Sequence, residues 1–145
     1  MADAPLNLQL QHELNLDIAR ILLAMLDSET PSVELRVSAL GRMIFYKTYA
    51  KSADGTRSID VPDGLGPLLS RLRHGMYHPG VGTWFTMRMT VELPARMTAD
   101  FNSVDEPSFG DRPPPPTGFA DELVLYPRDP EHVPAWLRTR VTPNP

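Results

Sequence analysis

Alternating apolar and polar residues predict four strands in two consecutive pairs. The first pair covers residues 32–39 and 43–50, and the second covers residues 83–93 and 96–102. Alternation over this many residues is typical of a strand that packs one face on a core and exposes the other to water. Because each pair is joined by only a few residues, the sequence predicts two antiparallel hairpins.

Apolar residues at helical spacing predict helices before, between and after these hairpins. The first helix is predicted over residues 8–28 and ends before Pro31, because the residue preceding a proline avoids the helical conformation. A second helix is best defined over residues 67–76, and two short helices are predicted over residues 119–126 and 130–140. The chain therefore alternates helices with strand pairs.

This order of elements predicts one α+β domain over residues 1–145, with an antiparallel sheet of about four strands and helices packed on one face. The polar residues 51–58 contain an Asp-Gly step and are expected to form a loop. A proline-rich loop is expected at residues 107–118. The face of the sheet without helices is expected to carry Arg36, Trp84, Arg88, Thr98 and Asp100. Trp84 would there be covered by the proline-rich loop or belong to the footprint of a partner.

The composition restricts where the protein works. The absence of cysteine excludes a disulfide framework and thiolate metal sites, and it fits a reducing cytoplasm. The first residues lack the basic and apolar regions of a secretory signal. The longest apolar run, residues 21–26, is far too short to span a bilayer. We therefore expect a cytoplasmic protein that does not associate with membranes.

The net charge of −4 is concentrated in one segment of the chain. Residues 100–131 contain eight acidic and two basic side chains, whereas residues 1–99 are balanced. A negative segment repels phosphate backbones, so the sequence disfavours nucleic-acid binding and favours a basic protein partner. The alternative interpretation is that these acids only keep the protein in solution.

Histidines and paired acids are the candidates for catalysis or metal binding. The pairs are His74 and His78, Asp105 and Glu106, and Asp121 and Glu122. The histidines have the spacing of helical metal ligands, but an intervening glycine and a following proline favour two surface histidines at a helix end. Adjacent acids rarely converge on one substrate, and acids at a helix start stabilise the helix dipole instead. The sequence therefore predicts no catalytic residues, no metal site and no cofactor.

Four strings in the second half of the chain form an ordered set. They are GTWF at residues 82–85, DF at 100–101, EP at 106–107, and DELVLYPRDPEHVPAWL at 121–137, of which the last is the most specific. This set resembles the YezG-like immunity protein family of bacterial polymorphic toxin systems. The resemblance implies a non-enzymatic protein that binds a co-encoded toxin domain, often a nuclease or another intracellular toxin, and blocks its active site.

The toxin-binding surface is expected on the open side of the sheet and in the acidic loop that follows it. The residues expected to contact the toxin are Trp84, Arg88, Asp100, Asn102, Asp105, Glu106, Phe109 and Asp111. An acidic loop is complementary to the basic site that a nuclease needs to attract phosphate. After Phe101 the family pattern has an acid, an aromatic residue and a second acid, where this chain has Asn102, Ser103 and Val104. The resemblance therefore does not identify the toxin.

The C-terminal string is expected to act as a structural clasp formed by Tyr126, Pro127, Arg128, Pro134 and Trp136. Arg128 is expected to pair with Asp121 or Glu122. Trp136 is expected to pack on the core, with direct contact to a partner as the alternative. Two other functions stay open: an adaptor module that uses the same face for another protein, and a small hydrolase that uses acids near the proline-rich loop.

Overall fold

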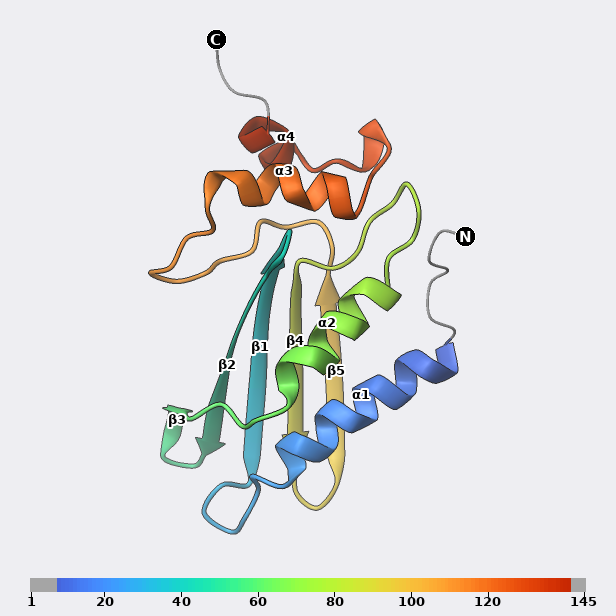
Figure 1. Ribbon diagram of the computed structural model, residues 1–145. Helices are drawn as coiled ribbons and strands as arrows, with labels where there is room; N and C mark the ends of the chain where they lie inside the picture. Colours follow the sequence, from blue (N-terminus) through green and yellow to red (C-terminus); the bar gives the residue numbers. More distant parts are fainter. Residues whose placement is uncertain (1–7, 142–145) are drawn as a thin grey trace.

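A five-stranded antiparallel sheet forms the centre of the protein (Figure 1). The computed structural model describes residues 8–141. The strand order is β3-β2-β1-β4-β5. The strands are β1 (Ser32–Leu40), β2 (Met43–Ser52), β3 (Gly55–Ile59), β4 (Thr86–Glu92) and β5 (Arg96–Asn102). The predicted α+β class is confirmed, with one strand more than the sequence pattern indicated.

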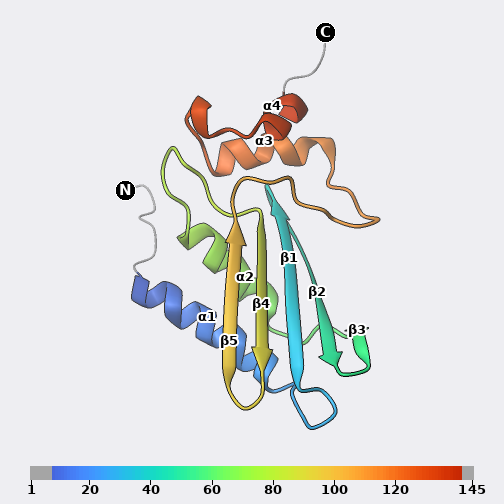
Figure 2. The same ribbon diagram turned by 180° about the vertical axis from the view of Figure 1, so that it is seen from behind.

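The helices are α1 (Leu8–Leu23), α2 (Leu65–Gly75), α3 (Pro116–Leu125) and α4 (Ala135–Val141), with a short 3-10 helix, η1 (Pro130–His132), before α4. Helices α1 and α2 cover one face of the sheet, whereas α3 and α4 lie across the end that carries the β1–β2 turn (Figure 1). Figure 2 shows the opposite face, which no helix of residues 8–141 covers. We call it the open face. None of the described helices is long and apolar enough to cross a membrane.

Two apolar cores hold these layers together. The larger core lies between the sheet and helices α1 and α2, and its buried residues include Ile18, Leu22, Leu35, Leu69 and Met89. The second core lies at the end of the sheet beneath α3 and α4 and is formed by Leu40, Phe85, Phe109, Phe119 and Leu137. Full burial of one such side chain contributes about 1.5–3 kcal/mol. Since short helices are marginal alone, packing on the second core is what stabilises α3 and α4.

Several predicted boundaries are wrong. Helix α3 begins at Pro116, inside the loop predicted at residues 107–118, because proline is accepted in the first turn of a helix. Three others have a local reason too. Residues 55–59 form β3 rather than a loop, because an exposed edge strand pairs through its backbone and needs no apolar side chains. Helix α1 ends at Leu23, since the side chain of Asp27 accepts two backbone hydrogen bonds, at 2.9 and 2.7 Å, and holds a turn there. The helix predicted over residues 130–140 is divided, because Pro134 keeps the residue before it extended.

Trp84 and Phe109 are buried, so the prediction that they contact a partner is wrong. Trp84 is 2% exposed and Phe109 is 4% exposed. Regular pairing of β4 begins only at Thr86, so Trp84 does not continue the alternation of that strand. Its ring lies in the larger core, 5.8 Å from that of Phe101. Phe109 belongs to the second core, where its ring lies 6.3 Å from that of Phe45.

A buried ion pair joins α2 to α3. One guanidinium nitrogen of Arg73, Nη2, donates to both carboxylate oxygens of Glu122 at 2.8 Å, and the two side chains are 1% and 0% exposed. The backbone N–H of Gly41 also donates to Glu122 at 2.7 Å, and Nε of Arg73 donates to the carbonyl of Trp84 at 2.9 Å. Buried charges are tolerated when they are paired and hydrogen-bonded in this way. The pair therefore fixes α2, α3, the β1–β2 turn and the segment before β4 to one another.

Arg128 fastens the segment after α3 to two loops. Its guanidinium donates to the carbonyl oxygens of Thr83 at 2.9 Å, Ser103 at 3.1 Å and His132 at 3.0 Å. It also lies 4.6 Å from the centre of the Phe85 ring, within the range of a cation–π contact. Burial lowers the pKa of Arg128 from its ordinary value. The side chain therefore acts as a structural connector between chain segments that are distant in sequence.

The predicted ion pair between Arg128 and Asp121 or Glu122 is wrong, because Glu122 is occupied by Arg73 and Arg128 binds carbonyl oxygens instead. Gly82 makes the position of Arg128 possible. It has a φ of 112°, and a Cβ at this position would overlap the guanidinium of Arg128. The GTWF and YPR strings of the sequence are therefore in direct contact in the fold.

Gly82→Ala should destabilise the protein more than Gly55→Ala. Both glycines have left-handed backbone angles, with φ of 112° and 120°, so both variants bear a strain of about 1–2 kcal/mol. Only the methyl group at position 82 meets Arg128, whereas nothing lies within 4 Å at position 55. We expect Gly82→Ala to lose about 1–3 kcal/mol more in the free energy of unfolding, measured in urea. Equal losses would show that the guanidinium of Arg128 does not pack against Gly82.

Glu122→Leu should cost about 3–5 kcal/mol, because Arg73 then keeps a buried charge without a partner. The double variant Arg73→Met/Glu122→Leu removes both charges and should recover part of this loss. Glu131→Leu, at an exposed position, is the control and should change stability by less than about 0.5 kcal/mol. Urea denaturation of the double variant and both single variants gives the coupling energy. Strict additivity of the two single losses would contradict the ion pair.

Candidate functional site

One row of side chains on the open face places three cations on adjacent strands. The register sets Lys47 of β2 opposite Arg36 of β1, Arg36 opposite Arg88 of β4, and Arg88 opposite Asp100 of β5. All four side chains are exposed. Like charges directly opposite one another destabilise a sheet, so folding alone does not explain this row. We call these four residues the charged row.

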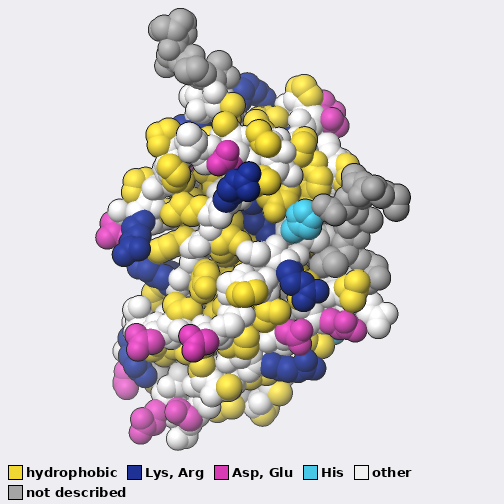
Figure 3. All heavy atoms as spheres, viewed as in Figure 1, with side chains coloured by type: hydrophobic (Ala, Val, Ile, Leu, Met, Phe, Trp, Pro, Cys, Tyr) yellow, Lys and Arg dark blue, Asp and Glu magenta, His cyan; other side chains and the backbone are white. Residues whose placement is uncertain are grey.

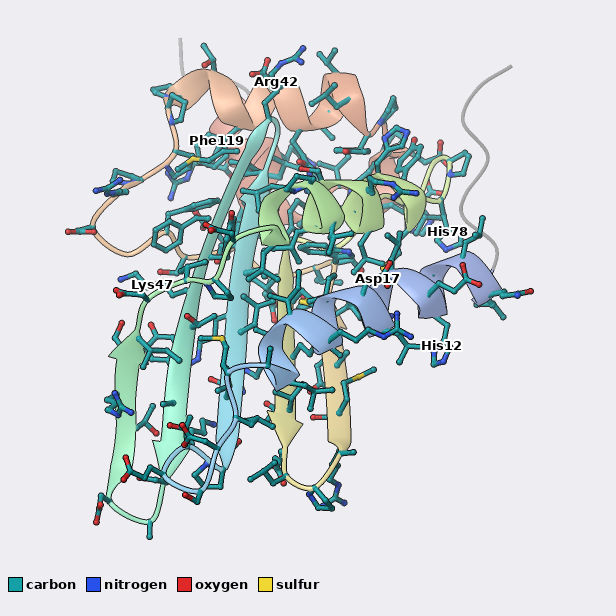
Figure 4. The ribbon with its side chains drawn as sticks, turned by 60° about the horizontal axis from the view of Figure 1, so that its bottom comes forward. His12, Asp17, Arg42, Lys47, His78 and Phe119 are labelled. Carbon is teal, nitrogen blue, oxygen red and sulfur yellow. The ribbon has the colours of Figure 1, made fainter. Side chains whose placement is uncertain are left out.

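The charged row crosses a cleft of about 740 Å³ on the open face. Strands β1, β2, β4 and β5 form its floor, and the loop after β5 forms one wall with Glu106, Ser108 and Gly110. Phe45 and Tyr49 lie on either side of Lys47 along β2, the strand on which Figure 4 labels this lysine. A cleft of this size admits several side chains of a protein partner or one small ligand.

Glu34 is the carboxylate that offsets the cations. Its side chain is 3% exposed and pairs with Arg36, with Nζ of Lys51 at 2.9 Å and, more distantly, with Nε of Arg88 at 3.9 Å. Burial alone would raise the pKa of Glu34, but hydrogen bonds from Lys51 and Arg36, together with their charges, lower it below its ordinary value of 4.5. One carboxylate thus serves three cations. Within residues 8–141, Lys47 has no ion pair.

Two aromatic rings of β2 position the cations. The guanidinium carbon of Arg36 lies 4.5 Å from the centre of the Tyr49 ring, and Nζ of Lys47 lies 5.6 Å from the centre of the Phe45 ring. Such contacts contribute about 0.5–1 kcal/mol each at exposed sites. The charges are therefore held against the sheet before any ligand is present.

The C-terminal helices fix the wall of the cleft, residues 103–111. Nε1 of Trp136 donates to the carbonyl of Val104 at 2.7 Å, and Arg140 pairs with Glu106 at 3.0 Å. Phe109 is anchored in the second core, and Arg128 binds the carbonyl of Ser103. The wall is thus attached at four of its residues, although it has no regular secondary structure.

The structure brings together half of the residues that the sequence assigned to toxin contact. Arg88, Asp100, Asn102 and Glu106 line the cleft. Asp105 and Asp111 are exposed but are not among its lining residues, and the buried Trp84 and Phe109 present no surface. The Oδ1 atom of Asn102 accepts the backbone N–H groups of Val104 and Asp105 at 2.9 Å, so part of its role is to hold the start of the loop.

Strand β2 contributes residues to the site that the sequence patterns did not predict. Phe45, Lys47 and Tyr49 all line the cleft, and Arg36 lies beside them. Their positions follow from alternation within residues 43–50, which puts every second side chain on the open face. The missing information was the register, because only the pairing of β2 with β1 shows that Lys47 lies opposite Arg36.

The clasp residues lie near the segment that follows α2. The ring of Tyr126 lies 5.5 Å from that of Tyr77, and the hydroxyl of Tyr77 donates to the carbonyl of Pro127 at 2.5 Å. Trp136 is half-buried and packs on the second core, edge-on to Phe85, with 4.9 Å between the ring centres. These contacts, with those of Arg128 described above, join residues 126–136 to the segment between α2 and β4 and to the loop after β5.

Three of the eight acids at residues 100–131 are buried, paired or placed beside cations. Glu122 is buried against Arg73, Glu106 is paired with Arg140, and Asp100 lies beside the cations of the charged row. On the opposite side of the molecule, Figure 3 shows acidic and basic side chains interspersed among apolar ones on the face that α1 and α2 cover. The expectation of an acidic surface for a basic partner therefore does not describe the cleft.

Charged, hydroxyl and aromatic side chains line the cleft. No histidine lines it, and one of its two carboxylates, that of Glu106, is engaged by Arg140. His78 lies on the loop after α2, where Figure 4 labels it, and not in the cleft. Within the described chain, no group of three His, Cys, Asp or Glu side chains could hold a metal ion.

A scan against models of protein families matched none, and a search of curated proteins found no match.

Glu34→Gln should destabilise the protein at neutral pH and lose this effect in acid. The fold lowers the pKa of Glu34, so its charge contributes stability above the ordinary value of 4.5, and this contribution disappears as the pH falls below that value. We expect a cost of about 1–2 kcal/mol at neutral pH, from urea denaturation at a series of pH values. Glu92→Gln, half-buried on the same face, is the control. A pH-independent difference between Glu34→Gln and the unaltered protein would contradict this assignment.

Proposed function

We propose that this protein is a non-enzymatic inhibitor that binds a toxin domain through the open face and the loop at residues 103–111, and obstructs the active site of the toxin. The observation that supports this best is the cleft, because its charges are held in place and its wall is anchored. Groups that are ordered before binding lose less conformational entropy on association, which raises affinity for a partner.

The resemblance to immunity proteins supports the proposal that the partner is a toxin domain. The resembling strings supply the framework around the cleft: Gly82 and Arg128 interlock, Glu122 pairs with Arg73, and Trp136 holds the wall. The cations of β1 and β2 lie outside those strings. This division suits a group of inhibitors that share one scaffold and present different surfaces to different toxins.

The expected footprint is larger than the cleft. Stable protein complexes bury about 800 Å² on each partner. Contact therefore extends from the charged row over the loop to Asp105 and Asp111, both of which are exposed. The footprint combines basic residues in the cleft with acidic residues at its edge. Complementary charges on the toxin would speed association and exclude unsuitable partners.

Coexpression with the toxin domain encoded beside this gene should allow cells to grow, whereas the toxin domain alone should stop growth. The purified proteins should form a complex on size-exclusion chromatography. Asp105→Arg/Asp111→Arg should weaken that complex by about tenfold or more through charge reversal within the footprint. Asp54→Arg/Asp63→Arg, at exposed positions outside it, is the matched control and should preserve binding.

Continued growth arrest despite good expression of this protein would overturn the proposal. Rescue of growth by hydrolysis of a toxin product or of another small molecule, without a complex, would favour the hydrolase interpretation instead. Stable binding to the neighbouring protein without any effect on its toxicity would favour the adaptor.

A further inference from the structure

We infer that the cleft on the open face receives an acidic peptide segment of the partner protein, with its carboxylates bound by Lys47, Arg36 and Arg88. This inference rests on the proposed function, since it specifies which part of a protein partner occupies the cleft. The sequence favoured a basic partner, whereas the segment inferred here is acidic. The reason for the change is that the acidic residues 100–131 of this chain do not line most of the cleft.

The first argument is that the charged row has more cations than the fold neutralises. Lys47 has no ion pair within residues 8–141, and Arg88 reaches Glu34 only at 3.9 Å. Glu34 must also serve Arg36 and Lys51. Because opposed like charges weaken a sheet, an external anion above the row would remove an unfavourable interaction as well as add a favourable one.

The second argument is that these cations are accessible. The side chains of Arg36 and Arg88 are 48% and 61% exposed, and both line the cleft. A guanidinium presents several N–H donors in a fixed plane and binds a carboxylate with two parallel hydrogen bonds. Neighbouring strands lie about 4.8 Å apart, so the three cations extend over about 10 Å. An extended segment with acids at alternate positions places successive carboxylates on one side at about 6.7 Å, which is compatible with this span.

The third argument separates a peptide from a nucleic acid. Three cations are few for a phosphate backbone, and Asp100 continues the same row with negative charge. The rings of Phe45 and Tyr49 have a cation over one face each, so they are not free platforms for stacked bases. Asp100 suits a basic residue next to the acids of a peptide, which a nucleic acid does not offer.

The test uses a fluorescein-labelled peptide of about ten residues with glutamate at alternate positions, and a matched peptide with glutamine at those positions. Fluorescence anisotropy with the full chain should show binding of the glutamate peptide at low salt, at least about tenfold tighter than the glutamine peptide, and weakening as salt is added. Lys47→Glu/Arg88→Glu should reduce binding of the glutamate peptide by about tenfold or more.

Arg42→Glu/Arg71→Glu changes the net charge equally at exposed positions outside the cleft, and it should retain binding within about threefold. Urea denaturation of both double variants establishes that they fold. Equal binding of the two peptides, or equal loss in the two double variants, would overturn the inference. Tighter binding of a short single-stranded oligonucleotide that is abolished by Lys47→Glu/Arg88→Glu would overturn it in favour of a nucleic acid.

The coexpression assay distinguishes this inference from the proposed function. If the unaltered protein and Lys47→Glu/Arg88→Glu both restore growth and bind the toxin equally, the inhibitor function stands. The inference that the cleft binds an acidic peptide of the partner is then wrong. If the unaltered protein fails to restore growth, the proposed function is wrong, and the peptide assay still determines whether the cleft selects carboxylates.

Discussion

The arrangement of α2, α3 and the β1–β2 turn depends on the buried pair of Arg73 and Glu122. A charge removed from water is unfavourable unless its partner is held in good geometry, so the two side chains require α2 and α3 to keep one relative position. The hydrogen bond from Gly41 brings the β1–β2 turn to the same carboxylate. This constraint fixes the orientation of α2 relative to α3, which apolar packing alone specifies less strictly.

The cleft follows from that constraint. Once α3 is placed, the chain beyond it returns along the edge of the second core, where Arg128 and Trp136 reach the loop after β5. The loop then stands beside the open face as a wall. On the floor of the cleft, Glu34 pairs with Arg36 and Lys51 and keeps both side chains against the sheet. The site is thus assembled by two carboxylates, one in the interior and one on the open face, neither of which needs to touch a ligand.

The alternation of residues 33–39 and 86–92 was sufficient to predict the antiparallel hairpins and the α+β class, because half-buried strands carry their own periodicity. It was insufficient for β3, whose exposed polar residues pair only through the backbone. Trp84 was misplaced because its predicted strand began three residues too early, in an irregular segment before Thr86. The cleft itself required the register between strands, and the partner of Glu122 required a contact across 49 residues, which no local pattern contains.

The connection between the clasp and the loop is made to main-chain atoms. Arg128 and Trp136 bind the carbonyl oxygens of Ser103 and Val104, whose own side chains are exposed. Because any amino acid supplies that oxygen, the side chains of residues 103 and 104 contribute little to the position of the loop. Substitutions at these two positions should therefore leave the architecture of the loop unchanged while altering the side chains that this edge of the protein presents to solvent.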